Sequence, residues 1–145
     1  MPLHILPEVP LDTGRLVPLA QPLASAGFPS PAGDDLEDEI DPIGWLVRHP
    51  SATFWWRVEG DCLWDAGIRD GDIIAVDRAA KCRPGRVVLA IIDDAIVAKI
   101  IMRRSSGQLY LTTANARENY SDIEFTESSH LWGVVAGVVR RLPVD

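Results

Sequence analysis

Short apolar runs, separated by polar turn residues, follow one another along the chain from residue 52 to residue 142. Each run is rich in β-branched and aromatic residues, which favour strands. The runs span residues 52–60, 72–78, 86–93, 95–103, 108–115 and 130–142. Asp93-Asp94 and Ser105-Ser106-Gly107 lie between pairs of runs and are typical of hairpin turns. This spacing predicts a mainly β domain, either a β-sandwich or a partly open barrel.

A short helix is expected just before these strands, in the segment PIGWLVRHP at residues 42–50. Asp41 can cap this helix and Pro42 suits its first position, and the helix must end near Pro50. Upstream, eight of the eleven prolines lie within the first 42 residues. Proline removes backbone donors and disfavours helix in the residue before it. We therefore expect residues 1–26 to form an extended N-terminal arm with little regular structure of its own.

An acidic segment lies between the arm and the predicted domain. Residues 27–41 contain six of the acidic side chains and no basic one, in a chain of formal net charge −7. This composition is typical of a solvated linker. Residues 42–145, the predicted β-rich domain, contain acidic and basic side chains in equal number. Direct nucleic-acid binding is therefore not expected, although a local basic patch remains open.

Composition argues against several other classes of protein. No run of 18 or more apolar residues is present, so no membrane-spanning helix is expected. Ala24-Ser25-Ala26 has the small-residue spacing of a signal-peptide cleavage site, but no apolar stretch precedes it. Two cysteines are too few for a disulfide framework, and the three histidines lack partners at metal-ligand spacing. We expect a reduced cytoplasmic protein without a metal or an organic cofactor.

Lys99 is the residue that most clearly indicates chemistry. It is the only charged residue in the run 95–102, and one of two lysines in a chain with twelve arginines. In an apolar environment, desolvation favours the neutral amine of a lysine, which can act as a general base. The alternative, which the pattern taken alone favours, is that Lys99 projects from an edge strand and extends its ammonium group into water.

Cys62 follows Glu59-Gly60-Asp61 at the end of a predicted strand. A nucleophile at such a junction is exposed, and backbone amides near it, including that of Cys62, can hold an oxyanion. Most free cysteines, however, are buried and inert. Trp64, in the polar loop that follows, is a candidate for contact with a bound peptide, whereas core packing is expected for most of the five tryptophans.

Taken together, these residues resemble the self-cleaving family of LexA repressors and UmuD-type mutagenesis proteins, whose members use a serine–lysine dyad in a β-rich domain. The resemblance covers residues 24–142. Gly60-Asp61-Cys62-Leu63 stands where the family has Gly-Asp-Ser-Met, and residues 67–77, GIRDGDIIAVD, match the turn and strand that follow. Lys99 lies 37 residues after Cys62, which is the spacing of the dyad lysine. Ala26-Gly27, followed by FPSPA, resembles the scissile bond.

Within this family the chain resembles UmuD more than LexA. A LexA-type repressor has a helix-turn-helix domain before its cleavage site, whereas only 26 residues precede Gly27 here, so a DNA-binding repressor is the weaker alternative. The resemblance implies an accessory subunit of an error-prone translesion DNA polymerase in the SOS response. A RecA filament would stimulate self-cleavage between Ala26 and Gly27, and the product, as a homodimer, would join a UmuC-like Y-family polymerase subunit.

The resemblance also implies the chemistry of the cut. The substrate would be the chain's own arm, with Cys62 as the nucleophile and Lys99 as the base and then the acid. The chain departs from the family because Cys62 stands in the serine position. A thiol, with an ordinary pKa of about 8.5, could pass its proton to Lys99 and form a thiolate–ammonium pair. The larger sulfur could instead misplace the attack.

Three interpretations of Cys62 therefore stay open. The first is a working Cys62–Lys99 dyad, and the second is a cleavage-deficient dimeric binding module that acts on a polymerase partner without proteolysis. The third is a cysteine introduced by engineering. We favour self-cleavage, because Lys99 and Ala26-Gly27 are intact.

Overall fold

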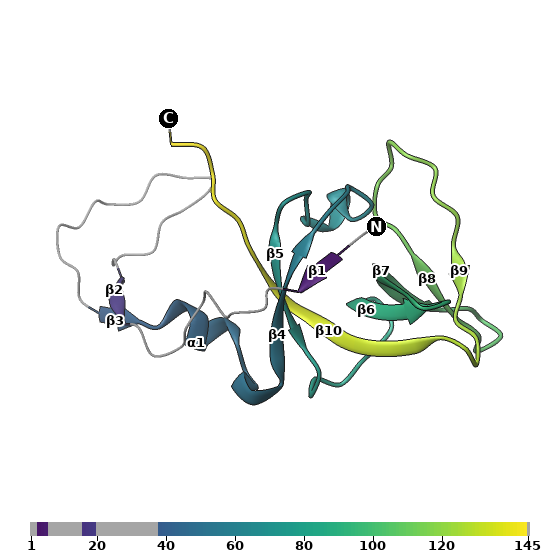
Figure 1. Cartoon of the computed structure of the whole chain (residues 1–145), viewed down its shortest axis with the longest axis horizontal. Coiled ribbons are helices and arrows are strands. Elements are labelled where there is room, and N and C mark those ends of the chain that lie inside the picture. Colours follow the sequence, from purple (N-terminus) through teal and green to yellow (C-terminus); the bar gives the residue numbers. More distant parts are fainter. Residues whose placement is uncertain (1–2, 6–15, 20–37, 145) are drawn as a thin grey trace.

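The computed structural model describes residues 3–5, 16–19 and 38–144 of the chain. Its main feature is an antiparallel sheet of eight strands in the order β1-β4-β5-β10-β6-β7-β8-β9 (Figure 1). These strands are β1 (Leu3–Ile5), β4 (Thr53–Val58), β5 (Ile73–Asp77), β6 (Val87–Ile92), β7 (Ala95–Arg103), β8 (Leu109–Thr112), β9 (Ile123–Glu124) and β10 (His130–Val139). The mainly β fold predicted from the sequence is confirmed.

The two predicted hairpin turns are present. Asp93 and Asp94 have φ values of 49° and 66°, and Ile92 pairs with Ala95 across them. Positive φ at both central residues is the mark of a type I′ turn, whose twist matches that of the flanking strands β6 and β7. Between β7 and β8, Gly107 has a φ of 96° and its amide donates to the carbonyl of Arg104 over 2.9 Å.

Strand β10 joins the two halves of the sheet. Its first part pairs with β6 and its second part pairs with β5, and Val134 has a partner on both sides. The register shifts at Trp132 and at Ala136, where each ladder has a bulge that bends the strand. No pairing between β1 and β9 joins the outer strands of the described sheet. The sheet is therefore open and does not close into a barrel.

A short helix, α1 (Pro42–Leu46), packs beside β4, β5 and β10. The Asp41 side chain accepts a hydrogen bond of 2.9 Å from the amide of Gly44, and Pro42 occupies the first turn. The predicted cap is confirmed, although the helix ends earlier than Pro50. Trp45 on this helix is 74% exposed, so it is an exception to the core packing expected for most of the tryptophans.

Three groups of buried side chains form the core. The largest lies between the two halves of the sheet and includes Trp56, Val58, Cys62, Leu63, Ile68, Ile74, Val76, Leu89 and Ala98. A second group lies among β6, β7, β8 and β10, and a third lies under α1. Cys62, the candidate nucleophile, is thus part of the main core.

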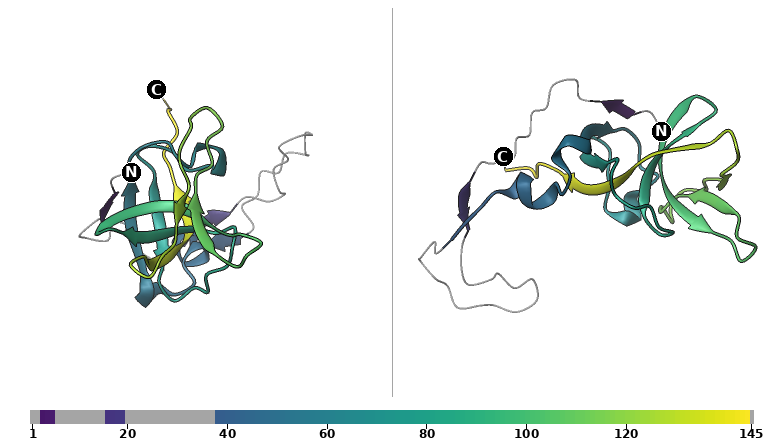
Figure 2. Two further views of the ribbon diagram at one scale, coloured as in Figure 1. Left: turned by 90° about the vertical axis from the view of Figure 1, so that its right-hand side faces the viewer. Right: turned by 90° about the horizontal axis from the view of Figure 1, so that it is seen from below.

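Two described parts of the predicted arm form strands. β1 pairs with β4, and β2 (Val17–Leu19) pairs with β3 (Asp38–Ile40). Figure 2 (right) shows the β2/β3 pair set apart from the eight-stranded sheet. The sequence did not predict these strands or β9, because two or three residues are too short to show an alternating pattern. Ala26, Gly27 and most of the predicted linker lie outside the described residues.

Candidate active site

Cys62 lies in a tight turn that follows β4. The chain reverses at Gly60, whose φ of 100° is a left-handed conformation that favours glycine. The Gly60 amide donates a hydrogen bond of 2.7 Å to the carboxylate of Asp70, which fixes the turn. Cys62 is only 2% exposed and packs in the largest core group. The sequence predicted an exposed nucleophile at this junction, and the structure corrects this to a buried thiol.

Lys99 lies on β7 and is also buried, at 8% exposure. β7 is flanked by β6 and β8, so the alternative that placed Lys99 on an edge strand is wrong. The Cys62 thiol donates to the carbonyl of Ala98, the residue directly before Lys99, over 3.6 Å, and the charge of Lys99 acts on the thiol. The fold thus brings together the two residues that the sequence singled out, which are 37 positions apart.

Burial and the lysine act on Cys62 in opposite directions. Burial raises the pKa of the Cys62 thiol, while the charge of Lys99 and its hydrogen bond lower that pKa. Burial has the larger effect, so the pKa of Cys62 lies above its ordinary value. At neutral pH the neutral thiol is therefore favoured over the stored thiolate–ammonium pair considered from the sequence. To act as a nucleophile, the Cys62 thiol would therefore have to lose its proton.

Asp61, the neighbour of Cys62, connects the turn to the loop that follows β8. Its backbone carbonyl accepts a hydrogen bond of 2.9 Å from the Asn115 side chain. Its carboxylate accepts one of 2.6 Å from the Tyr120 hydroxyl, and the Tyr120 ring centre lies 5.5 Å from Lys99 Nζ. The loop that follows β8 therefore contacts Lys99 and Asp61, the residue directly before Cys62. Sequence reasoning missed Asn115 and Tyr120, since their loop was predicted in part as strand.

Trp64 lies in a 3₁₀ helix, Trp64–Ala66, directly after the turn. The guanidinium carbons of Arg69 and Arg117 lie 3.9 Å and 4.5 Å from its ring centre. Cation–π contacts of this kind account for the position of the indole without a ligand. Contact between Trp64 and a bound peptide stays a prediction, as do an oxyanion role for the Cys62 amide and cleavage at Ala26-Gly27.

Two further properties concern the described residues only. No group of three His, Cys, Asp or Glu side chains among them is arranged to hold a metal ion. No helix in the same part of the chain is long and apolar enough to cross a membrane.

Comparisons with known proteins show which family the chain resembles. Residues 18–138 match the family described as Peptidase S24-like. The chain is 35% identical over 135 residues to protein ImpA of Escherichia coli, covering 90% of this chain and 88% of ImpA. It is 40% identical over 124 residues to protein SamA of Salmonella typhimurium, covering 86% and 85% of the two chains.

A LexA repressor of Shewanella woodyi is 36% identical over 122 residues, which span 81% of this chain but 57% of the repressor. The similarity to ImpA and SamA thus extends over most of both chains, whereas that to LexA covers little more than half of the repressor. The chain therefore belongs to the Peptidase S24-like family, as a UmuD-type member of the LexA/UmuD group.

Proposed function

We propose that this UmuD-like SOS mutagenesis protein cuts its own arm between Ala26 and Gly27, with Cys62 as nucleophile and Lys99 as general base. One observation supports the proposal above the others: Cys62 and Lys99 are both buried and lie beside each other, with the Cys62 thiol 3.6 Å from the carbonyl of Ala98, the residue directly before Lys99. A nucleophile beside a buried amine that can act as a base is the arrangement that covalent catalysis requires.

The proposed reaction has two stages. Cys62 Sγ bonds to the carbonyl carbon of Ala26 while its proton passes to Lys99 Nζ. The Lys99 ammonium then gives that proton to the amide nitrogen of Gly27, the C–N bond breaks, and Ala26 is left as a thioester on Cys62. Water, deprotonated by Lys99, hydrolyses the thioester, and the proton returns to the sulfur. The proton transfer in the first step is needed because burial favours the neutral thiol.

The product of the cut would have a role in DNA damage tolerance. We propose that a RecA filament stimulates cleavage, and that the shortened chain, as a homodimer, joins a UmuC-like Y-family polymerase subunit in translesion synthesis. The similarity to ImpA and SamA over most of their lengths supports this role. We expect the protein to act in the cytoplasm.

A second candidate is a binding module that no longer cuts. The raised pKa of Cys62 favours it, because a thiol that holds its proton more tightly is a poorer nucleophile at neutral pH. In this case the long form itself would bind the polymerase partner. The two candidates differ in whether any arm is released.

Intact mass spectrometry of the full-length chain separates the two candidates. The chain is incubated with and without a RecA filament assembled on single-stranded DNA, at neutral and at alkaline pH. Self-cleavage gives two species, residues 1–26 and 27–145, and their amount rises with pH as the thiol deprotonates. Lys99→Ala abolishes both species, whereas Cys82→Ser, which changes the other cysteine, leaves cleavage unchanged.

The serine variant Cys62→Ser completes the experiment. If the wild-type chain stays intact and Cys62→Ser is cut, the scaffold is competent and the cysteine disables it, which supports the binding module. If Lys99→Ala is cut as fast as the wild type, the proposed dyad is wrong. Circular dichroism of each variant verifies that the sheet is retained.

A further inference from the structure

The outer side of β4 is covered by β1, a strand that lies before the proposed cleavage site. Three residue pairs join them: Leu3 with Val58, His4 with Arg57, and Ile5 with Trp56. On its other side β4 pairs with β5. In the described sheet, β1 is therefore the strand that keeps β4 from being an edge.

Arg57 presents its backbone groups to β1. Its neighbour Val58 bonds toward β5: the Val58 amide donates to Asp72 and its carbonyl accepts from Gly71, both over 2.8 Å. Because successive residues of a strand bond to opposite sides, the amide and carbonyl of Arg57 point toward β1. Loss of β1 would leave these two groups as an open pairing site.

The register places His4 on β1 opposite the cationic residue Arg57 on β4. Directly opposed residues of an antiparallel pair interact, and opposite charges stabilise the pair whereas like charges destabilise it. A strand with a carboxylate in the position of His4 would therefore pair better with β4 than β1 does. By this criterion another strand can replace β1 beside β4.

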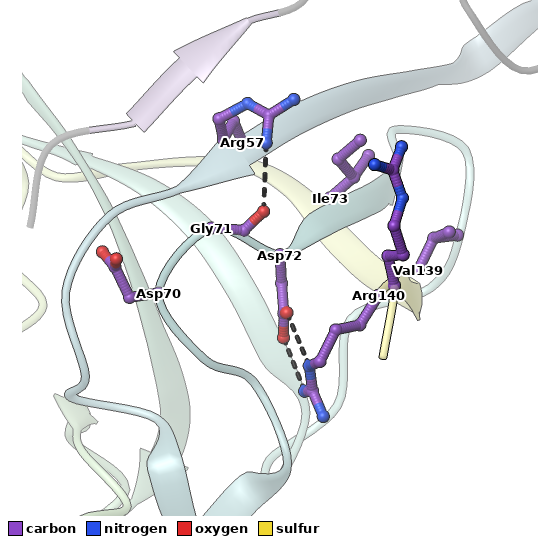
Figure 3. A pocket seen from close by; sticks show the side chains of 8 residues that line it. Arg57, Asp70, Gly71, Asp72, Ile73, Val139 and Arg140 are labelled. Carbon is purple, nitrogen blue, oxygen red and sulfur yellow. Dashed lines mark hydrogen bonds and ion pairs between the residues drawn. The ribbon is translucent and has the colours of Figure 1, made fainter. Parts of the chain in front are cut away.

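A cationic groove adjoins the same strand (Figure 3). It has a volume of about 840 Å³ and is lined by Arg57, Asp70, Gly71, Asp72, Ile73, Val139, Arg140 and Arg141. Asp72 is held by Arg140 through two hydrogen bonds of 2.6 Å and 2.7 Å, so this pair is neutral. The Arg57 guanidinium donates to the carbonyl of Gly71 over 3.1 Å, which leaves its charge uncompensated by that contact. Three arginines against two aspartates leave the groove positive in a chain of net charge −7.

We propose that the edge of β4 at residues 56–58, once β1 has left, binds an extended segment of a partner protein that places an acidic side chain opposite Arg57. The partner adds a strand to the sheet, as β1 does in the uncut chain, and its carboxylate meets the cationic groove. The release of β1 by cleavage rests on the proposed function. Cleavage then serves to open a docking site that the arm covers.

The test uses two fluorescent heptapeptides, MPLEILP and MPLKILP, which copy residues 1–7 with Glu or Lys in place of His4. Binding is measured by fluorescence polarisation with the full-length chain and with its His4→Pro variant, in which proline cannot donate to Arg57. Opening the edge should tighten binding of the Glu peptide by about tenfold, because the tethered β1 no longer competes. The Glu peptide should bind about threefold tighter than the Lys peptide.

Three further variants verify the direction of each effect. In the His4→Pro chain, Arg57→Gln removes the preference for the Glu peptide, whereas Arg48→Gln, which changes another exposed arginine, preserves it. His4→Glu should stabilise the pairing of β1 with β4. This variant should therefore bind the peptides more weakly than the wild type does. Equal binding to the wild type and to His4→Pro, or equal binding of the two peptides, would overturn the proposal.

These measurements do not depend on cleavage. The His4→Pro variant opens the edge in the uncut chain, so an inactive Cys62 leaves the expected binding unchanged. Failure of self-cleavage and failure of strand addition therefore give different results.

Discussion

Asp61 fixes the position of the proposed nucleophile from two sides. Its backbone carbonyl accepts hydrogen bonds from the Asn115 side chain and from the Trp64 amide, over 2.9 Å and 3.1 Å. Its carboxylate accepts the Tyr120 hydroxyl. Since small displacements of reacting groups are costly in covalent catalysis, these contacts would matter for a cysteine in a site that the family builds for serine.

The Tyr120 contact predicts an unusual titration. The hydrogen bond to the Asp61 carboxylate raises the pKa of Tyr120 to about 12, since ionisation would place two negative charges together. In a Tyr110→Phe background, Tyr120 is the remaining tyrosine, so ultraviolet absorbance should report a single transition near this value. Adding Asp61→Asn should move the transition back toward about 10. An unchanged transition would show that the carboxylate does not control Tyr120.

The same contact has a consequence for stability at high pH. A phenol whose pKa is raised by folding stabilises the protein fully below the ordinary pKa, and this stabilisation is lost as the pH rises toward 12. The loop that contains Tyr120 should therefore detach from the turn in strong alkali.

At the scale of the elements, β10 approaches its neighbours closely at two glycines. A Cβ on Gly133 would lie 2.7 Å from the Val76 side chain and 3.3 Å from the carbonyl of Asp77. A Cβ on Gly137 would overlap the side chain of Leu46 on α1. The first neighbour is a fully buried, β-branched residue next to backbone, whereas the second is a half-buried side chain on a five-residue helix.

These surroundings predict different results for the two alanine variants. Gly133→Ala should destabilise the protein by about 1–3 kcal/mol, because neither Val76 nor the backbone can yield. Gly137→Ala should cost less, since α1 can shift, and Leu46→Ala should rescue it in a double-mutant cycle of urea unfolding. If the destabilisation by Leu46→Ala simply adds to that by Gly137→Ala, the two residues are not in the close contact that the structure shows.

At the scale of the whole molecule, an ion pair ties the end of β10 to the start of β5. Arg140 donates two hydrogen bonds to Asp72, which is 2% exposed and also accepts the Arg69 amide over 2.7 Å. Burial acts to raise the pKa of Asp72, but the hydrogen bonds from Arg140 and Arg69 together with their charges outweigh it and lower that pKa. The stabilisation is present above the ordinary carboxyl pKa and is lost as the pH falls below it.

Asp72→Asn should therefore lower the melting temperature at pH 7 by roughly 5–10 °C. The difference from the wild type should shrink as the pH falls below the ordinary carboxyl pKa of about 3.9, because the unfolded chain then binds a proton that the folded chain does not. Calorimetry over this pH range measures the effect, with Glu127→Gln, an exposed carboxylate, as the control. If the decrease in melting temperature is the same at every pH, packing and not charge stabilises the protein at Asp72.

Sequence reasoning succeeded where local chemistry decides structure. The cap at Asp41, the turn at Asp93-Asp94 and the long strands follow from short-range rules, and the pairing of Cys62 with Lys99 followed from the family pattern. It failed where tertiary contacts decide. The burial of Cys62 and the attachment of the Asn115 loop depend on residues far apart in the chain.

β10 has a further consequence through its place between the two halves of the sheet. Neither half can open without breaking backbone pairs to this strand, because its first part belongs to one ladder and its second part to the other. Local openings of the two halves are thereby coupled, and the domain from β4 to β10 should unfold as one cooperative unit. The backbone amides around Val134, where the ladders meet, should be among the last to exchange with solvent hydrogen.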